Sequence, residues 1–95
     1  MWIFYLQAME EIYTVYAICS KKDGRIYVGF SGDAEKRLLQ HNQGKTKSTK
    51  GYVPWELIYT QQIIGRENAR EREIKLKSGS GKEFLKALRN SRNER

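Results

Sequence analysis

Two tyrosines in the first third of the sequence can place their phenols side by side. Tyr16 lies in a run of β-branched and aromatic residues over 11–20, and Tyr27 lies in a second run over 25–30. The segment 21–24, Lys-Lys-Asp-Gly, predicts the turn of a hairpin between them. If these four residues form the loop, residue 16 pairs with 29 and 18 with 27, so both phenols share one face as diagonal neighbours. Tyrosine is also a common strand residue, and the pair by itself does not establish a site.

Arg37 and His41 are the next residues that could do chemistry. They lie four positions apart in a segment that predicts a helix, so their side chains project from one face, one turn apart. An arginine binds a phosphate through two parallel hydrogen bonds, and a histidine moves a proton near neutral pH. The pair therefore suits phosphoryl chemistry, although the same spacing also arises on ordinary solvated helices.

Glu73 is the candidate ligand of a metal ion. In a predicted helix over 66–77 it shares a stripe with Ala69 and Leu76. A carboxylate among apolar neighbours needs a partner, and a divalent cation is one. Lys77, one turn further on, offers a salt bridge instead. Glu71 is the competing ligand, because the phase of the helix is only inferred.

The elements that must position these residues begin with the hairpin. After it, Asp33 offers an N-cap for a helix that starts near Ala34 and ends over 42–44, where Gly44 suits a left-handed turn. This helix should direct Leu38 and Leu39 inward. The segment 45–51 contains no apolar residue, which predicts an exposed basic loop.

The second half of the sequence predicts one more strand and two helices. From Pro54 onward, Trp55, Leu57 and Tyr59 alternate with Glu56, Ile58 and Thr60, which predicts a strand. The helix over 66–77 follows, and a last helix is expected near 82–90, with Ser80 and Glu83 spaced as a capping box. The predicted fold is α+β, a three-stranded antiparallel sheet flanked by helices in the order β-β-α-β-α-α.

The composition favours one domain with an anionic partner. Its 95 residues suffice for a single hydrophobic core, and 39% of them are hydrophobic. Lys and Arg number 18 against 11 Asp and Glu, a formal net charge of +7, and such an excess attracts nucleic acid. A basic domain whose charge serves only solubility is the alternative.

Cys19 is the only cysteine, which excludes an intramolecular disulfide and a cysteine-rich zinc site. We therefore expect a cytoplasmic protein with no disulfide-linked partner. The apolar start over 1–6 is far shorter than the roughly 20 residues that cross a bilayer, so no membrane association is expected. We interpret residues 1–10 as an N-terminal extension that need not be native, 11–90 as the functional domain and 91–95 as a basic tail.

Taken together, these residues stand in an order that resembles the GIY-YIG nuclease superfamily, especially its small stand-alone bacterial members. Five blocks carry the resemblance: Thr14-Val15-Tyr16; Tyr27-Val28-Gly29; Asp33-x-x-x-Arg37-Leu38-x-x-His41-Asn42-x-Gly44; Thr49-Lys50 with Pro54-Trp55-x-Leu57-x-Tyr59; and Ala69-x-x-x-Glu73-x-x-Leu76-Lys77. Thr14 stands where the first motif has Gly, and Val28 where the second has Ile. Neither departure removes a side chain that the chemistry would use.

The resemblance implies a metal-dependent endonuclease that hydrolyses DNA phosphodiester bonds, with a role in DNA repair or recombination. Glu73 would hold one Mg²⁺ or Mn²⁺, and Arg37 would hold the scissile phosphate. Tyr16, assisted by His41, would activate or orient the attacking water, with Tyr27 as a second phenol. A free tyrosine titrates near ~10, so Tyr16 serves as a base only where nearby cations lower its pKa, as Arg37 and the metal could.

The resemblance also implies contacts to the nucleic-acid backbone from basic side chains on the loop and the last two helices: Lys45, Lys47, Lys50, Lys77, Lys82, Lys86 and Arg89. Some family members place a further polar group after the metal ligand, and Asn90 is the candidate here. The alternatives are a nucleic-acid-binding module that does not cleave and a protein-interaction domain. Substrate structure, sequence specificity and oligomeric state are not defined by these residues.

Overall fold

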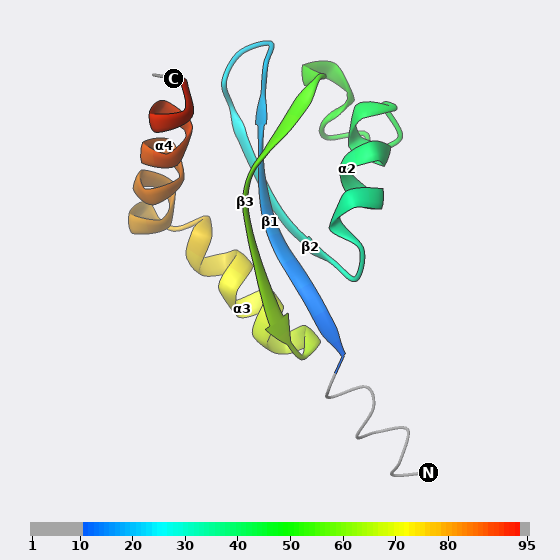
Figure 1. Ribbon diagram of the computed structural model, residues 1–95, viewed down its shortest axis with the longest axis vertical. Coiled ribbons are helices and arrows are strands. Elements are labelled where there is room, and N and C mark those ends of the chain that lie inside the picture. The colour runs from blue at the N-terminus through cyan, green and yellow to red at the C-terminus, as the bar shows by residue number, and fades with distance from the viewer. Residues whose placement is uncertain (1–10, 94–95) are drawn as a thin grey trace, which may run out of the picture.

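A computed structural model describes residues 11–93 and confirms the predicted fold class and element order (Figure 1). Strands β1 (Ile12–Ser20), β2 (Ile26–Ser31) and β3 (Trp55–Ile64) form one antiparallel sheet in the order β2-β1-β3. Helix α2 (Ala34–Asn42) covers one face, and helices α3 (Arg66–Leu76) and α4 (Gly79–Asn93) lie on the other. The predicted extension over 1–10 lies outside the described residues, and 91–93 of the predicted tail belong to α4.

The hairpin has the predicted register. Tyr16 pairs with Gly29 and Ile18 with Tyr27, and the amide of Ser20 donates to the carbonyl oxygen of Arg25 at 2.8 Å. Since side chains alternate between faces along a strand, Tyr16 and Tyr27 both lie on the face covered by α2.

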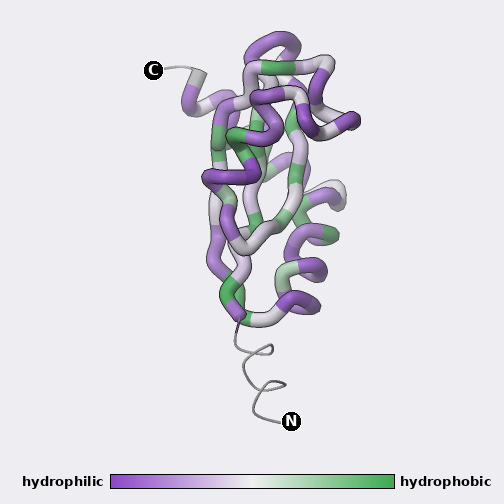
Figure 2. Tube along the Cα trace, turned by 90° about the vertical axis from the view of Figure 1, so that its right-hand side faces the viewer, coloured by the Kyte–Doolittle hydropathy of each residue, from purple (hydrophilic) through white to green (hydrophobic). Residues whose placement is uncertain are grey.

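The central strand β1 is buried on both faces, which divides the core in two. Tyr16 and Ile18 pack with Trp55 beneath α2, whereas Val15 and Ala17 pack with the buried apolar residues of α3 and α4. Most residues along the helices are hydrophilic, and short apolar stretches interrupt them (Figure 2). No helix among residues 11–93 combines the length and apolar character needed to cross a membrane.

The predicted alternation of side chains along β3 is wrong at one point, because the strand contains a bulge. Ala17 pairs with Tyr59 but Ile18 pairs with Leu57, so Ile58 is an extra residue between them. One inserted residue moves the following side chains to the opposite face. Tyr59 therefore leaves the face of Leu57 and packs edge-on against Phe84 of α4, with ring centroids 5.4 Å apart.

Helix α2 agrees with the prediction at both ends but not in its inward side chains. Asp33 caps it by accepting from the amide of Lys36 at 3.1 Å, and Gly44 has φ +75°. Leu38 packs into the core beneath the helix, as expected. Leu39 does not, because the helix turns its side chain outward and leaves it 57% exposed.

Helix α4 begins earlier than predicted. It starts at Gly79, so Ser80 lies inside the first turn instead of capping it. The reason is the close crossing of α3 and α4 at Gly81, where a Cβ would clash with the carbonyl oxygen of Lys75 and lie 2.5 Å from Leu76 Cα. The sequence pattern predicts a helix break at Gly81, but in the structure this glycine permits the two helices to touch.

Candidate active site

The two phenols meet above Gly29 of β2. The Tyr16 side chain is only 1% exposed. A Cβ at Gly29 would lie 2.8 Å from the Tyr16 phenol oxygen and 3.3 Å from Cε1 of Tyr27. The glycine thus clears the space in which both rings lie. The hairpin pattern predicts the pairing of residues 16 and 29 but gives no sign of this requirement.

His41 of α2 lies against both tyrosines. Its imidazole is fully buried, with Nε2 3.0 Å from the Tyr16 hydroxyl and its ring centroid 5.0 Å from that of Tyr27. On its other side, Nδ1 lies 2.8 Å from Oγ1 of Thr49. The predicted four-residue spacing therefore places the only histidine of the chain between a phenol and a hydroxyl.

The prediction that the whole segment 45–51 is an exposed loop is wrong at Thr49. It is fully buried, because the loop folds back over the core and the indole of Trp55 donates to the Thr49 carbonyl oxygen at 2.9 Å. Lys45, Lys47 and Lys50 are exposed, as predicted. The sequence block that joins Thr49 to Trp55 was the only signal that could have indicated this contact.

Arg37 lies one turn before His41 and is half-buried. Its Nη1 donates to Oε1 of Gln40 at 3.1 Å. It borders a hollow of about 560 Å³ between the end of β2 and α2, a volume within the range of small-ligand sites. Arg37 also acts on Tyr16, since its nearby guanidinium lowers the pKa of that phenol.

Glu73 reaches this group from the opposite face of the sheet. Its side chain is 18% exposed, and its Oε2 lies 3.4 Å from Nζ of Lys77, so the predicted alternative of a salt bridge is present. The carboxylate is close enough to be among the charges that raise the Tyr16 pKa. Glu71 instead lines a hollow beside residues 61–64 of β3. Of the two predicted carboxylates, Glu73 is the one whose charge acts on Tyr16.

The electrostatics of the pair Tyr16 and His41 are set mainly by burial. Burial raises the pKa of Tyr16 to about 12, Tyr27 and Glu73 add to this, and Arg37 opposes it. Arg37 thus acts in the expected direction, but in the protein alone burial outweighs it. Burial, followed by the charge of Arg37, lowers the pKa of His41. At neutral pH the site thus holds a neutral imidazole against a protonated phenol.

The donor set around Glu73 fits a hard, hydrated cation. The described residues contain no group of three or more His, Cys, Asp or Glu side chains that could hold a metal ion. Structural and catalytic zinc sites use three or four protein ligands. Mg²⁺ commonly binds through one or two carboxylates and keeps several waters, which a partly exposed single carboxylate permits.

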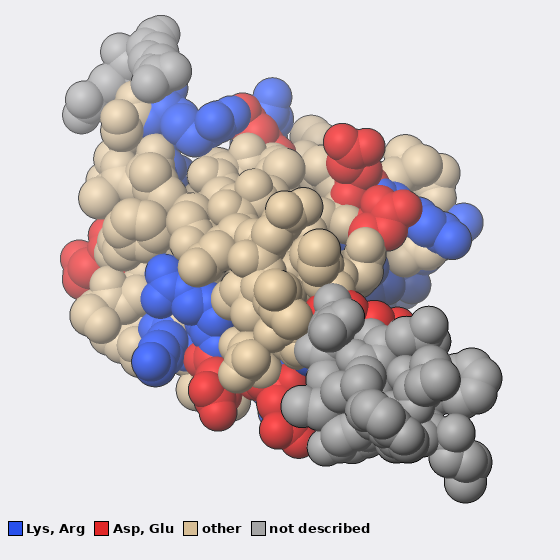
Figure 3. Space-filling model, turned by 60° about the horizontal axis from the view of Figure 1, so that its bottom comes forward, with Lys and Arg blue, Asp and Glu red and all other residues tan. Residues whose placement is uncertain are grey.

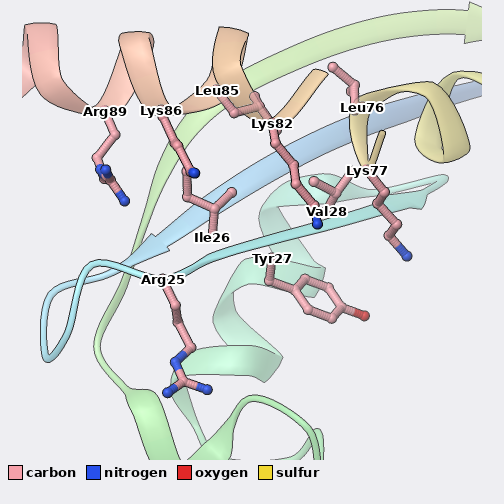
Figure 4. A pocket seen from close by; sticks show the side chains of 10 residues that line it. All are labelled: Arg25, Ile26, Tyr27, Val28, Leu76, Lys77, Lys82, Leu85, Lys86 and Arg89. Carbon is pink, nitrogen blue, oxygen red and sulfur yellow. The ribbon is translucent and has the colours of Figure 1, made fainter. Parts of the chain in front are cut away.

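The predicted basic residues fall into two separate places. Lys77, Lys82, Lys86 and Arg89 line a groove of about 470 Å³ between β2 and the last two helices, with Tyr27 in its wall (Figure 4). Lys45, Lys47 and Lys50 lie on the loop after α2 instead. Asn90 is exposed on α4, where it accepts from Nε of Arg89 at 3.2 Å.

The groove contrasts with the surface around it. Arg25 also contributes to its lining, but its guanidinium turns away and stacks 3.5 Å from the ring centroid of Tyr52. Among residues 11–93, no acidic side chain lines the groove. The face shown in Figure 3 instead carries both signs of charge close together. The groove is therefore a local concentration of positive charge that borders Tyr27.

Comparison with known proteins relates this arrangement to one family. The sequence profile of the family described as the GIY-YIG catalytic domain matches residues 12–86. A UPF0213 protein of Staphylococcus saprophyticus is 35% identical over 81 residues, which cover 84% of this chain and 96% of that protein. The structure-specific endonuclease subunit slx1 of Xenopus laevis is 39% identical over 51 residues, 50% of this chain and 18% of its own length. The solution NMR structure of a UPF0213 protein from Bacillus halodurans is 34% identical, with 81% of this chain and 84% of that one covered and a TM-score of 0.49.

Proposed function

Because this chain belongs to the GIY-YIG family of nuclease domains, we propose that it is a metal-dependent endonuclease that hydrolyses phosphodiester bonds in DNA. One observation carries the proposal. Tyr16, Tyr27 and His41 from one face of the sheet and Glu73 from the other gather around the edge strand β2, beside Arg37. Such a group of a carboxylate, a guanidinium, a buried imidazole and two phenols is what hydrolysis of a phosphodiester needs.

Each residue has a separate role in the proposed reaction. Glu73 would hold the cation, and a Mg²⁺ or Mn²⁺ bound there would supply positive charge to stabilise the leaving 3′ oxygen. Arg37 binds the scissile phosphate from the hollow that it borders. Tyr16 orients the attacking water and takes its proton, with His41 as the hydrogen-bond partner that makes this possible. Tyr27 donates a second phenolic hydrogen bond.

The groove holds the sugar-phosphate backbone of the substrate through Lys77, Lys82, Lys86 and Arg89, and the loop lysines 45, 47 and 50 form a second contact. Such contacts provide affinity with little sequence information. A role in DNA repair or recombination is the cellular function that we infer. It is supported only by the partial similarity to a structure-specific endonuclease subunit.

The proposal is tested with purified wild type, Glu73→Gln and Glu71→Gln on plasmid, branched and single-stranded DNA, with Mg²⁺ or Mn²⁺. Glu71 is the matched control, because it lies on the same helix but beside β3. We expect Glu73→Gln to abolish cleavage while binding remains, and Glu71→Gln to cleave as wild type does. Equal trace cleavage by all three proteins would instead indicate a contaminant, and the enzymatic assignment would fall.

The salt bridge between Lys77 and Glu73 favours a second candidate, a module that binds nucleic acid without cleaving it. Lys77 already pairs with the carboxylate that would hold the cation. For such a module we expect binding to DNA that weakens with salt, and DNA that stays intact after incubation with either cation. The same three proteins therefore separate the two functions.

A further inference from the structure

Thr49 is a buried hydroxyl to which the proposed function gives no role, although it touches the central histidine. Its Oγ1 lies 2.8 Å from Nδ1 of His41 and 3.3 Å from the carbonyl oxygen of Thr46. Nε2 of the same imidazole lies 3.0 Å from the Tyr16 hydroxyl. Phenol, imidazole, hydroxyl and carbonyl thus form one continuous line of hydrogen bonds, and its three side chains are at most 1% exposed.

The protons along this line can be assigned from the phenol outward. Within the described residues, the Tyr16 hydroxyl has one hydrogen-bond partner, Nε2 of His41. The phenolic proton of Tyr16 needs an acceptor of its own, because buried donors are rarely left unpaired. His41 Nε2 is the acceptor within reach, and it accepts only when it carries no proton.

The remaining protons follow from this assignment. A neutral imidazole with an unprotonated Nε2 carries its proton on Nδ1. That proton is donated to Oγ1 of Thr49, and the hydroxyl proton of Thr49 is directed to the Thr46 carbonyl. Thr49 is held in place for this task from two sides. Its carbonyl accepts from the Trp55 indole, and its amide donates to Thr46 at 3.1 Å.

We propose that Thr49 is a positioning residue that holds His41 in the Nδ1–H tautomer, so that Nε2 is free to receive the proton of Tyr16 during hydrolysis. This inference rests on the proposed nuclease function, since it assigns the proton path of that reaction. Thr49 touches neither substrate nor reacting atoms. It acts through His41.

The proton path balances over the whole step. Tyr16 takes a proton from the attacking water as its own proton passes to His41 Nε2, which leaves an imidazolium hydrogen-bonded to Thr49. The oxygen of that water forms the new bond to phosphorus, and the bond from phosphorus to the 3′ oxygen breaks. The leaving oxygen is protonated by solvent, and the imidazolium returns its proton to solvent through Tyr16. The products are a 5′-phosphate and a 3′-hydroxyl.

The single histidine makes the tautomer directly measurable. We would record the imidazole nitrogens of ¹⁵N-labelled, untagged protein by NMR at a pH where the ring is neutral. In the wild type we expect a protonated Nδ1 and an unprotonated Nε2. Thr49→Ser keeps the hydroxyl and should keep this pattern. Thr49→Val removes the acceptor, and the proton should move toward Nε2.

Cleavage assays on the same proteins complete the test. We expect Thr49→Val to lower kcat by about tenfold or more, up to the ~10²–10⁴-fold that a general base contributes in full, with KM unchanged. Thr49→Ser should restore kcat. The proposal is overturned if the wild-type proton lies on Nε2, or if Thr49→Val keeps the wild-type tautomer and kcat. If even the wild type fails to cleave, the nuclease function is lost, whereas the wild-type spectrum still decides the proton assignment without any variant.

Discussion

A buried neutral histidine makes the stability of this protein depend on pH in a defined direction. Burial lowers the pKa of His41 below its ordinary 6.5, so the unfolded chain takes up a proton before the folded one does. The free energy of unfolding should therefore be undiminished above 6.5 and fall as the pH drops from 6.5 through the folded pKa. Urea unfolding between pH ~7.5 and ~5 measures this. His41→Gln should flatten this part of the profile, and an unchanged slope would show that His41 is not the group responsible.

Because Gly29 has no side chain, it leaves room for the two tyrosine rings above β2. Adding one methyl group at this position tests that role. Gly29→Ala brings a Cβ to within 3.0 Å of two atoms of the Tyr16 phenol, so the ring must shift and its contact with His41 is disturbed. We expect a loss of about 1–3 kcal/mol of stability, typical of overpacking, together with a loss of cleavage. Gly32→Ala is the matched control, because a Cβ at Gly32 would meet no described atom within 4 Å. Equal behaviour of the two variants in unfolding and cleavage assays would contradict a steric role for Gly29.

The residues of the site that could be predicted are those related by local spacing. The strand period and the hairpin register place Tyr16 beside Tyr27, and the helix period aligns Arg37 with His41. Thr49 could not be predicted in this way. Its neighbours are polar and charged, which indicates exposure, and its burial comes from the Trp55 indole in the following strand. Side chains that support a site from a distance leave no periodic signal.

At the level of elements, the crossing of α3 and α4 determines where Glu73 is held. Gly81 lets the first turn of α4 lie against the last turn of α3, so Gly81→Ala must push the two helices apart. We expect a loss of stability of at least the about 1–3 kcal/mol of an overpacked core, and weaker cleavage because Glu73 lies on α3. Gly79→Ala, also in the first turn of α4 but with no described atom within 4 Å of its Cβ, should leave the unfolding midpoint close to wild type. Equal midpoints for both variants would exclude a close helix crossing.

The ends of helices and strands could be predicted well where residues close in sequence determine them. Asp33 and Gly44 bound α2 because a cap and a left-handed turn act within a few residues. The bulge at Ile58 and the early start of α4 had no such signal. The first depends on how β3 pairs with β1, and the second on the contact of Gly81 with α3. Both are fixed by neighbours that are distant in sequence or belong to another element.

For the whole molecule, the position of β2 at the edge of the sheet explains how one site can use both faces. Helix α2 supplies Arg37 and His41 from one side, and α3 supplies Glu73 from the other. A central strand would separate these groups behind its neighbours on either side. In the proposed site they approach one another around this edge, and the groove beside β2 continues the same edge toward α4. Under the proposed function, substrate backbone bound in the groove would pass beside Tyr27.

If the substrate backbone follows the groove beside β2, the basic side chains of the groove should contribute most to the binding of DNA. Lys82→Ala with Lys86→Ala removes two cations from the groove, whereas Lys45→Ala with Lys47→Ala removes two from the loop. Each lost phosphate contact should reduce the slope of log affinity against log salt by about 0.9 on duplex DNA. We expect the larger reduction from the groove pair, measured by fluorescence titration with an oligonucleotide at several salt concentrations. Lys75→Ala, on the β3 side of α3, controls for net charge and should leave the slope nearly unchanged. A larger reduction from the loop pair would place the backbone along α2 instead, because binding energy follows the cations that the phosphates touch.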